Sequence, residues 1–118
     1  MATTSITVQQ ILERKGNRIY AVGADSTVFE ALELMAEADI GGVLVIDDGV
    51  LKGIFTERDY ARKIVLKGLV SRNVNVGQMM TANPVTVPPT APLNGVMQTM
   101  TRRRFRHLPV VDGDTVVG

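Results

Sequence analysis

Apolar residues recur along the chain at two spacings, one typical of helices and the other typical of strands. In residues 8–12 and 28–35 they stand three or four positions apart, which predicts two amphipathic helices. Residues 19–22 have the pattern of a short strand, and the continuous apolar run 42–46 is typical of a strand buried on both faces. The pattern therefore predicts alternating helices and strands around one core.

Polar residues mark where these elements begin and end. Thr27 and Glu30 have the spacing of a helix-capping box, and Asp47-Asp48-Gly49 predicts a tight turn into another strand. That strand leads into Thr56, which stands where a helix N-cap belongs, and a helix is expected from about Glu57 to Lys67. Capping alone would account for Thr56 and for the carboxylate three positions later.

The chain contains an internal repeat that appears when it is shifted by 65 residues. The identities are Val22 with Val87, Met35 with Met100, Val45 with Val110, Asp47 with Asp112 and Gly53 with Gly118. The N-terminal helix matches at a shift of 68, where Val8 falls on Val76. We therefore predict two copies of one β-α-β-β-α unit, in residues 1–70, which include the N-terminal helix, and in residues 71–118.

The second copy is predicted to be incomplete. It stops at Gly118, the equivalent of Gly53, before the strand end and the last helix of the first copy. A terminus at this point would leave the strand 108–111 poorly covered. We therefore expect the native chain to continue.

Composition excludes several classes of function. The chain has 118 residues, 45% of them hydrophobic, a net charge of +1, no Cys and one His. Disulfides and multi-histidine metal sites are therefore excluded, and a near-neutral chain with few aromatic residues is a poor candidate for nucleic-acid binding. No secretory leader or membrane-spanning run is visible, so the default expectation is a soluble cytoplasmic protein without a membrane partner.

Three motifs are informative in combination: Gln78–Thr81 ahead of Asn83–Val87, Phe105–Asp112, and Gly53–Asp59. Together, and in a duplicated chain, they resemble the CBS domain family, paired in tandem as a Bateman module of the stand-alone bacterial type. The resemblance implies an α/β (α+β) fold in which two repeats pack with pseudo-twofold symmetry, leaving clefts between them. It also implies binding of adenine nucleotides such as AMP, ADP, ATP, NAD or S-adenosylmethionine.

The resemblance assigns Asp59 to the ribose hydroxyls and Thr56 to the same strand–helix step. An ionised carboxylate accepts two adjacent hydroxyl protons well, which agrees with this assignment. The candidate nucleotide-binding residues are Thr56, Asp59, Arg58, Ile19, Tyr20, Gly42, Val43, Thr81, Asn83, Val85, Arg106, His107, Leu108 and Pro109.

Each group of candidates also has an ordinary structural interpretation. The apolar candidates could be core residues, and Gly42 could serve a helix exit and close packing. Arg106 and His107 are phosphate candidates because they enter the strand that is expected to line the cleft, and the guanidinium fork suits phosphate oxygens. Arg58 is a second phosphate candidate, which could equally be a solvent-exposed helix residue.

The function expected from the sequence is regulatory rather than catalytic. No nucleophile and base stand in a recognised catalytic motif, so neither an enzyme, nor a catalytic cofactor, nor a metal site is predicted. We expect a sensory module that binds an adenine nucleotide of the AMP, ATP or NAD type and signals through a homodimer or a protein partner. The alternative is a structural dimerisation domain without a ligand, in which Thr56 and Asp59 only cap a helix.

Overall fold

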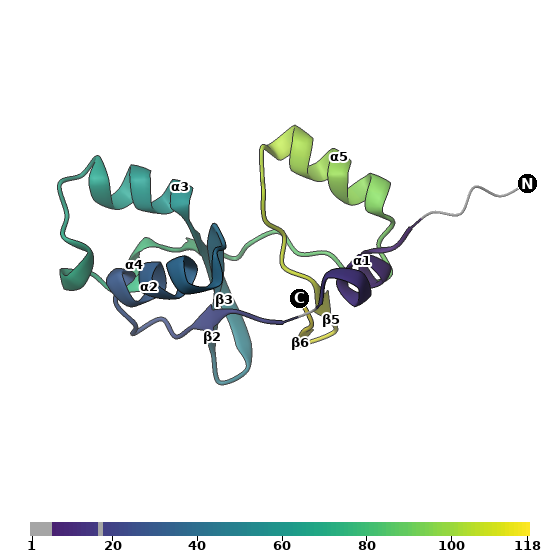
Figure 1. The fold of residues 1–118 in the computed structure, drawn as a ribbon, viewed down its shortest axis with the longest axis horizontal. Helices are drawn as coiled ribbons and strands as arrows, with labels where there is room; N and C mark the ends of the chain where they lie inside the picture. Colours follow the sequence, from purple (N-terminus) through teal and green to yellow (C-terminus); the bar gives the residue numbers. More distant parts are fainter. Residues whose placement is uncertain (1–5, 17) are drawn as a thin grey trace, which may run out of the picture. The chain divides into compact units, whose positions relative to one another are not determined.

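The structure is a computed structural model that describes residues 6–16 and 18–118. Residues 1–5, on which part of the expectation of no leader rests, lie outside this range. The chain forms two compact units (Figure 1). We call Tyr20–Pro84 the central unit, and we call the N-terminal segment through Ile19 together with Val85–Gly118 the terminal unit.

A four-stranded sheet forms the frame of the central unit, with the strand order β1-β2-β3-β4. The strands are β1 (Ala21–Val22), β2 (Gly42–Asp47), β3 (Val50–Thr56) and β4 (Thr81–Ala82). β1 lies parallel to β2, and the other two pairs are antiparallel. The predicted turn between β2 and β3 is confirmed: Asp48 and Gly49 both have positive φ, at 51° and 75°, as a two-residue hairpin turn requires.

Helix α2 (Val28–Ala38), predicted from its apolar stripe, packs that stripe against the sheet. The core cluster consists of Val28, Ala31, Met35, Val43, Val45, Phe55, Ile64 and Val76. Burying one such side chain contributes roughly 1.5–3 kcal/mol. The cluster also includes residues from beyond the sheet, so α2 and the two later helical segments share one core.

The helix predicted from Glu57 to Lys67 is present, but its winding differs from the expectation. Only α3 (Glu57–Asp59) is α-helical, and it continues as the π-helix η1 (Tyr60–Val65). The amide of Leu66 donates to the carbonyl of Ala61 at 3.0 Å, five residues back, as in a π-helix. Ile64 on η1 is 2% exposed, so the wider turn still presents an apolar residue to the core.

The terminal unit contains α1 (Val8–Lys15), α5 (Leu93–Arg103) and a hairpin of β5 (Val111–Asp112) and β6 (Thr115–Val116). Its core consists of Val8, Val96 and Val110, with Leu12, Val87, Ala91, Met100, Leu108 and Val117 packed around them. Each of the three buried residues comes from a different segment: α1, α5 and the residue just before β5. The core therefore joins the start of the chain to its end.

The 65-residue repeat extends to the pairing of the backbone. Equivalent pairs are Val22–Val45 and Val87–Val110, both parallel, and Val45–Gly53 and Val110–Gly118, both linked through the backbone. In the central unit the register shifts after Val45, and in the terminal unit Val111 pairs with Val116 as its equivalent Ile46 pairs with Leu51. The duplicated sequence therefore specifies the same irregular register twice.

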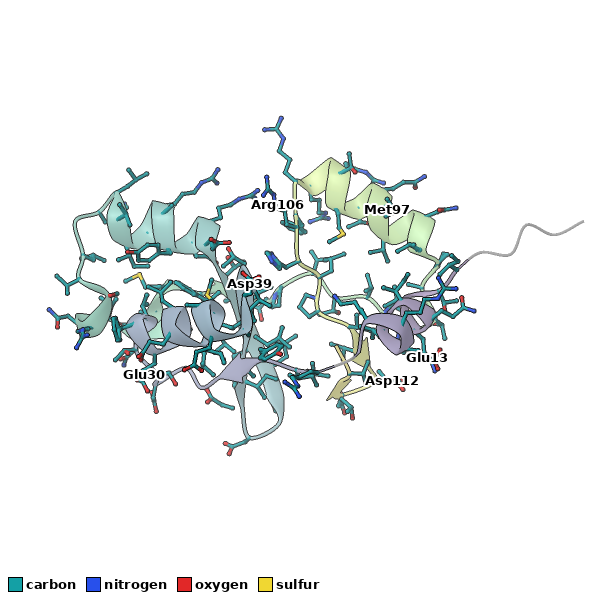
Figure 2. The ribbon with its side chains drawn as sticks, in the orientation of Figure 1. Glu13, Glu30, Asp39, Met97, Arg106 and Asp112 are labelled. Carbon is teal, nitrogen blue, oxygen red and sulfur yellow. The ribbon has the colours of Figure 1, made fainter. Side chains whose placement is uncertain are left out.

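The ends of the two long helices repeat as well. The C-cap residue of α2 is Asp39, labelled in Figure 2, and that of α5 is Arg104. Both have a left-handed backbone, with φ of 56° and 59°. The amide of Asp39 reaches the carbonyl of Met35, and the amide of Arg104 reaches that of Met100. Two non-glycine residues at equivalent strained positions indicate that the helix exit is a property of the repeat.

The first helix of each repeat lies in the unit formed mainly by the other repeat. α1 belongs to the terminal unit, and α4 (Val76–Met79), which follows the 3₁₀ turn η2 (Ser71–Asn73), belongs to the central unit. Equivalent backbone hydrogen bonds hold the two helices. At α1, Val8 N donates to Ala91 O at 2.9 Å and Leu93 N to Ile6 O at 2.7 Å. At α4, Val76 N donates to Ser26 O at 2.8 Å and Val28 N to Val74 O at 2.9 Å. The division predicted at residue 70 follows the repeats along the sequence, whereas the compact units exchange their first helices.

Among the helices of residues 6–16 and 18–118, none is long and apolar enough to cross a membrane.

Candidate functional site

The step from β3 to α3 carries a reciprocal cap. Thr56 donates from its amide at 3.0 Å and from Oγ1 at 3.2 Å to Oδ2 of Asp59, and the amide of Asp59 donates back to Thr56 Oγ1 at 3.3 Å. The predicted capping role of Thr56 is confirmed. One oxygen of the Asp59 carboxylate is therefore fully engaged within its own turn.

The other oxygen of Asp59 binds side chains from beyond that turn. Thr81 Oγ1 donates to Oδ1 at 3.0 Å, and the ammonium of Lys63 lies 3.0 Å from the same atom. Among the described residues Asp59 is the one charged residue that is buried, with 6% exposed, whereas the Lys63 side chain is 40% exposed. The carboxylate is thus compensated by one cation and three hydrogen-bond donors.

Lys63 also links this carboxylate to the end of α4. Its Nζ donates to the carbonyl of Met79 at 3.0 Å and to that of Met80 at 3.2 Å. Backbone carbonyls at a helix C-terminus have no partners within the helix and carry partial negative charge, so a cation is favourable there. Sequence reasoning missed Lys63, although its position four residues after Asp59 on a predicted helix was an available signal.

Several predicted site residues lie at the same end of the central sheet. Gly42 pairs with Thr56 across β2 and β3, and Thr81 pairs with Ile54, two residues before Thr56. Tyr20, just ahead of β1, accepts a hydrogen bond from the amide of Leu44 at 3.0 Å and packs against the core. The structure therefore brings Tyr20, Gly42, Thr56 and Thr81 to the end of the sheet at which Asp59 lies.

Three further candidates in the central unit are placed differently. Val43 is 2% exposed and fills the core, so a ligand could reach little of its side chain. Arg58 is exposed on α3, and Asn83 is exposed, with a left-handed φ of 50°. Their roles toward a ligand stay predictions.

The remaining candidates belong to the terminal unit. They are Ile19, Val85, Arg106, His107, Leu108 and Pro109. Ile19 is 40% exposed, and Arg106, labelled in Figure 2, is exposed beyond the end of α5. Leu108 packs against the core of this unit, and the buried Pro109 accepts a bond from the amide of Val87 at 3.1 Å. Their binding roles also stay predictions.

The chemistry of the site suits recognition of hydroxyl groups. The partners on Oδ1 of the buried Asp59 carboxylate are side chains, so the oxygen could be offered to vicinal hydroxyls of a ligand when they move away. In the part of the chain that the structure describes, no three His, Cys, Asp or Glu side chains are grouped so that they could hold a metal ion.

Comparison with known proteins identifies the family. The family model described as CBS domain matches residues 6–66 and again residues 76–118. The chain belongs to the CBS domain family and carries two repeats of it. The predicted mixed helix-and-strand fold of tandem repeats is confirmed by the solved structures that it matches.

Three similar proteins show how closely the chain resembles known members of the family. The CBS domain-containing protein CBSX3, mitochondrial, of Arabidopsis thaliana is 35% identical over 97% of this chain, which spans 60% of that relative's length. A CBS-domain protein of Burkholderia ambifaria MC40-6 is 44% identical, with a TM-score of 0.91 over 96% of this chain and 85% of its own. The CBS domain pair of protein MJ0100 is 25% identical, with a TM-score of 0.85 over 98% of this chain and 88% of its own, and was solved in complex with 5′-methylthioadenosine and S-adenosyl-L-methionine.

These matches establish the general class of function. CBS pair proteins are regulatory modules, one of them, protein MJ0100, was solved with two adenosine derivatives, and the names of the relatives indicate no enzyme activity.

Proposed function

We propose that this chain is a regulatory module that binds an adenosine-containing nucleotide of the AMP, ATP or NAD type, with the ribose hydroxyls held by the carboxylate of Asp59. The observation that carries the proposal is the buried Asp59, whose Oδ1 binds Thr81 and the part-exposed Lys63, both from beyond its own turn. Such partners can exchange for a ligand's hydroxyls at little cost, because side chains move more readily than backbone.

The complex of protein MJ0100 with two adenosine derivatives supports the choice of ligand class. Both of those ligands carry a ribose ring, so a carboxylate that accepts vicinal hydroxyls would serve each of them. Thr56 would keep its capping bonds to Oδ2, while Tyr20 and Gly42 lie at the same end of the sheet and could border the base. Arg58, Arg106 and His107 remain the phosphate candidates.

The test is calorimetric titration of the full chain with AMP, ATP, NAD and S-adenosylmethionine. We expect one of them to bind, and we expect Asp59→Asn to weaken that binding by about 10- to 100-fold, since hydrogen bonds to charged groups contribute about 1.5–3 kcal/mol. Asp25→Asn is the matched control, because Asp25 is exposed in the same unit and loses the same charge.

The 2′-deoxy form of the bound nucleotide sharpens the assignment. If Asp59 accepts the ribose hydroxyls, the deoxy ligand should bind the wild-type protein more weakly and should lose little more on Asp59→Asn, because the two changes remove one shared interaction. Additive losses would place the ribose elsewhere.

A structural domain without a ligand is the second candidate, and one observation favours it. All the acceptor positions of Asp59 already have partners within the chain, which is what a purely structural carboxylate would show. No heat with any of the four ligands, together with lower thermal stability of Asp59→Asn, would support this second function and overturn the first.

For the output of the module we propose a homodimer or a protein partner, with α5 as a contact surface. Met97 on α5, labelled in Figure 2, is 56% exposed and lines a shallow hollow with Gln98, Thr101 and Arg102. A single helix lines this hollow, which suits packing against another protein better than enclosing a small molecule.

A further inference from the structure

The ammonium of Lys63 occupies a position that the ribose would need. Its three protons have three acceptors: Asp59 Oδ1 at 3.0 Å, the Met79 carbonyl at 3.0 Å and the Met80 carbonyl at 3.2 Å. The ammonium therefore links η1 directly to the end of α4, and it also occupies the carboxylate oxygen that is proposed to accept a ribose hydroxyl.

A carboxylate offers about four acceptor positions, and all of those on Asp59 are in use. Two lie on Oδ2 and are taken by Thr56, one of them by a backbone amide that cannot move without unwinding the turn. The other two lie on Oδ1 and are taken by Thr81 and Lys63. Because the Lys63 side chain is 40% exposed, its ammonium can swing into solvent without any change of the backbone.

We propose that Lys63 is a built-in competitor for the ribose: it occupies Oδ1 of Asp59 in the unliganded protein and must leave when ribose hydroxyls bind. This inference rests on the proposed function, since it takes Asp59 as the ribose acceptor. The departure of Lys63 also frees the carbonyls of Met79 and Met80, so occupancy of the site loosens the link between η1 and α4. Ligand binding is thereby coupled to how firmly η1 holds the end of α4.

The first experiment compares the affinities of adenosine and AMP for the wild-type chain, Lys63→Met and Lys67→Met. Adenosine carries no phosphate, so its affinity reports on the ribose and base without the attraction between an ammonium and a phosphate. Lys67 is exposed four residues further along and provides the matched loss of charge. We expect Lys63→Met to bind both ligands about two- to five-fold more tightly, the range of a partly exposed ion pair, and Lys67→Met to leave the affinity for adenosine unchanged.

The outcomes separate the inference from the proposed function. The inference is supported if Lys63→Met binds adenosine more tightly than the wild-type chain and Lys67→Met does not. The same holds if the wild-type affinity is too weak to measure and Lys63→Met binds measurably. Equal or weaker adenosine binding overturns it, and so does a loss confined to AMP, which would make Lys63 a phosphate ligand. Absence of binding by all three proteins overturns the proposed function and the inference with it.

A second measurement uses the wild-type protein, so it does not depend on the folding of a variant. Lysine amines are acetylated with an N-hydroxysuccinimide ester, with and without saturating adenosine, and the modification is quantified by mass spectrometry. We expect the rate at Lys63 to rise when adenosine is bound, because the amine is released from three acceptors, while the rate at Lys67 stays constant. An unchanged or lower rate at Lys63 overturns the inference.

Discussion

At the scale of single residues, Gly53 determines how closely β4 approaches β3. A Cβ at this position would lie 2.6 Å from Met80 Sδ and 2.6 Å from the carbonyl oxygen of Thr81. These distances are well below van der Waals contact. The missing side chain therefore lets the chain pass close enough for Thr81 to reach Asp59.

We expect Gly53→Ala to destabilise the protein by about 1–3 kcal/mol, because the new methyl group meets backbone that cannot move aside. Thermal unfolding measures the loss of stability. Gly95→Ala in α5 is the control: its Cβ would lie 3.8 Å from the nearest atom, and alanine in a helix gains about 0.5–1 kcal/mol. Equal stability of the two variants would contradict the packing argument.

The residues of the site illustrate what a sequence can predict. The cap formed by Thr56 depends on neighbours three residues apart, so the local pattern was sufficient to predict it. The contacts of Lys63 with Met79 and Met80 join positions 16 and 17 residues apart through a fold that no local pattern describes. The ribose-binding role of Asp59 came from the family resemblance alone and remains a proposal.

At the scale of elements, the start of α2 is stabilised by the predicted capping box. The carboxylate of Glu30, labelled in Figure 2, accepts bonds from the amide of Thr27 at 3.0 Å and from its hydroxyl at 3.1 Å. These bonds, the backbone bond first, lower the pKa of Glu30 from its ordinary value of 4.5. The depressed pKa stabilises the folded state above pH 4.5, and this contribution is lost as the pH falls through the folded pKa.

Titration of Glu30 by NMR should give a pKa below 4.5 in the wild-type protein. Thr27→Ala removes the hydroxyl bond and leaves the amide bond, so we expect the pKa of Glu30 to move only part of the way back toward 4.5. In thermal unfolding from pH 7 to pH 3, the wild-type protein should lose more stability than Glu30→Gln, whose side chain does not titrate. Parallel curves for the two proteins would show that the cap contributes nothing to the pH dependence.

The type of helix could not be predicted for every helical segment. The bounds of α2 follow from an apolar stripe that lasts for three turns, with a cap at its start. η1 has only six residues, and over that length the spacing of apolar residues does not distinguish a π-helix from an α-helix. The extent of a helical segment is therefore easier to predict than its winding.

At the scale of the whole molecule, the repeats in the sequence and the compact units in space have different boundaries. The apolar faces of α1 and α4 predict that each helix packs against something, but periodicity does not say against what. Their real partners are set by pairing between Thr7 and Pro92 and between Thr27 and Asn75. Such long-range bridges leave no trace in the local sequence.

The central unit should fold by itself. A fragment of residues 20–84 holds the four-stranded sheet, α2, η1 and α4, including Val76, which is fully buried in the core. We expect it to show a dispersed amide NMR spectrum and cooperative thermal unfolding. A fragment of residues 1–70, which follows the sequence repeat and has a similar length, lacks β4 and α4 and should show neither.

Circular dichroism and hydrogen exchange on the two fragments provide the comparison, with the full chain as reference. Cooperative unfolding of the fragment 1–70, or none in the fragment 20–84, would show that the sequence repeat is the folding unit after all.

The exchanged first helices bear on how such a chain could arise. In a polypeptide with one repeat, the first helix could pack in the same way against a second molecule, which would give a domain-swapped dimer. Duplication of its gene, followed by fusion of the copies, would place both halves of that dimer on one chain without any change of contacts. The different boundaries of repeats and units are the arrangement that such a fusion of two copies would leave.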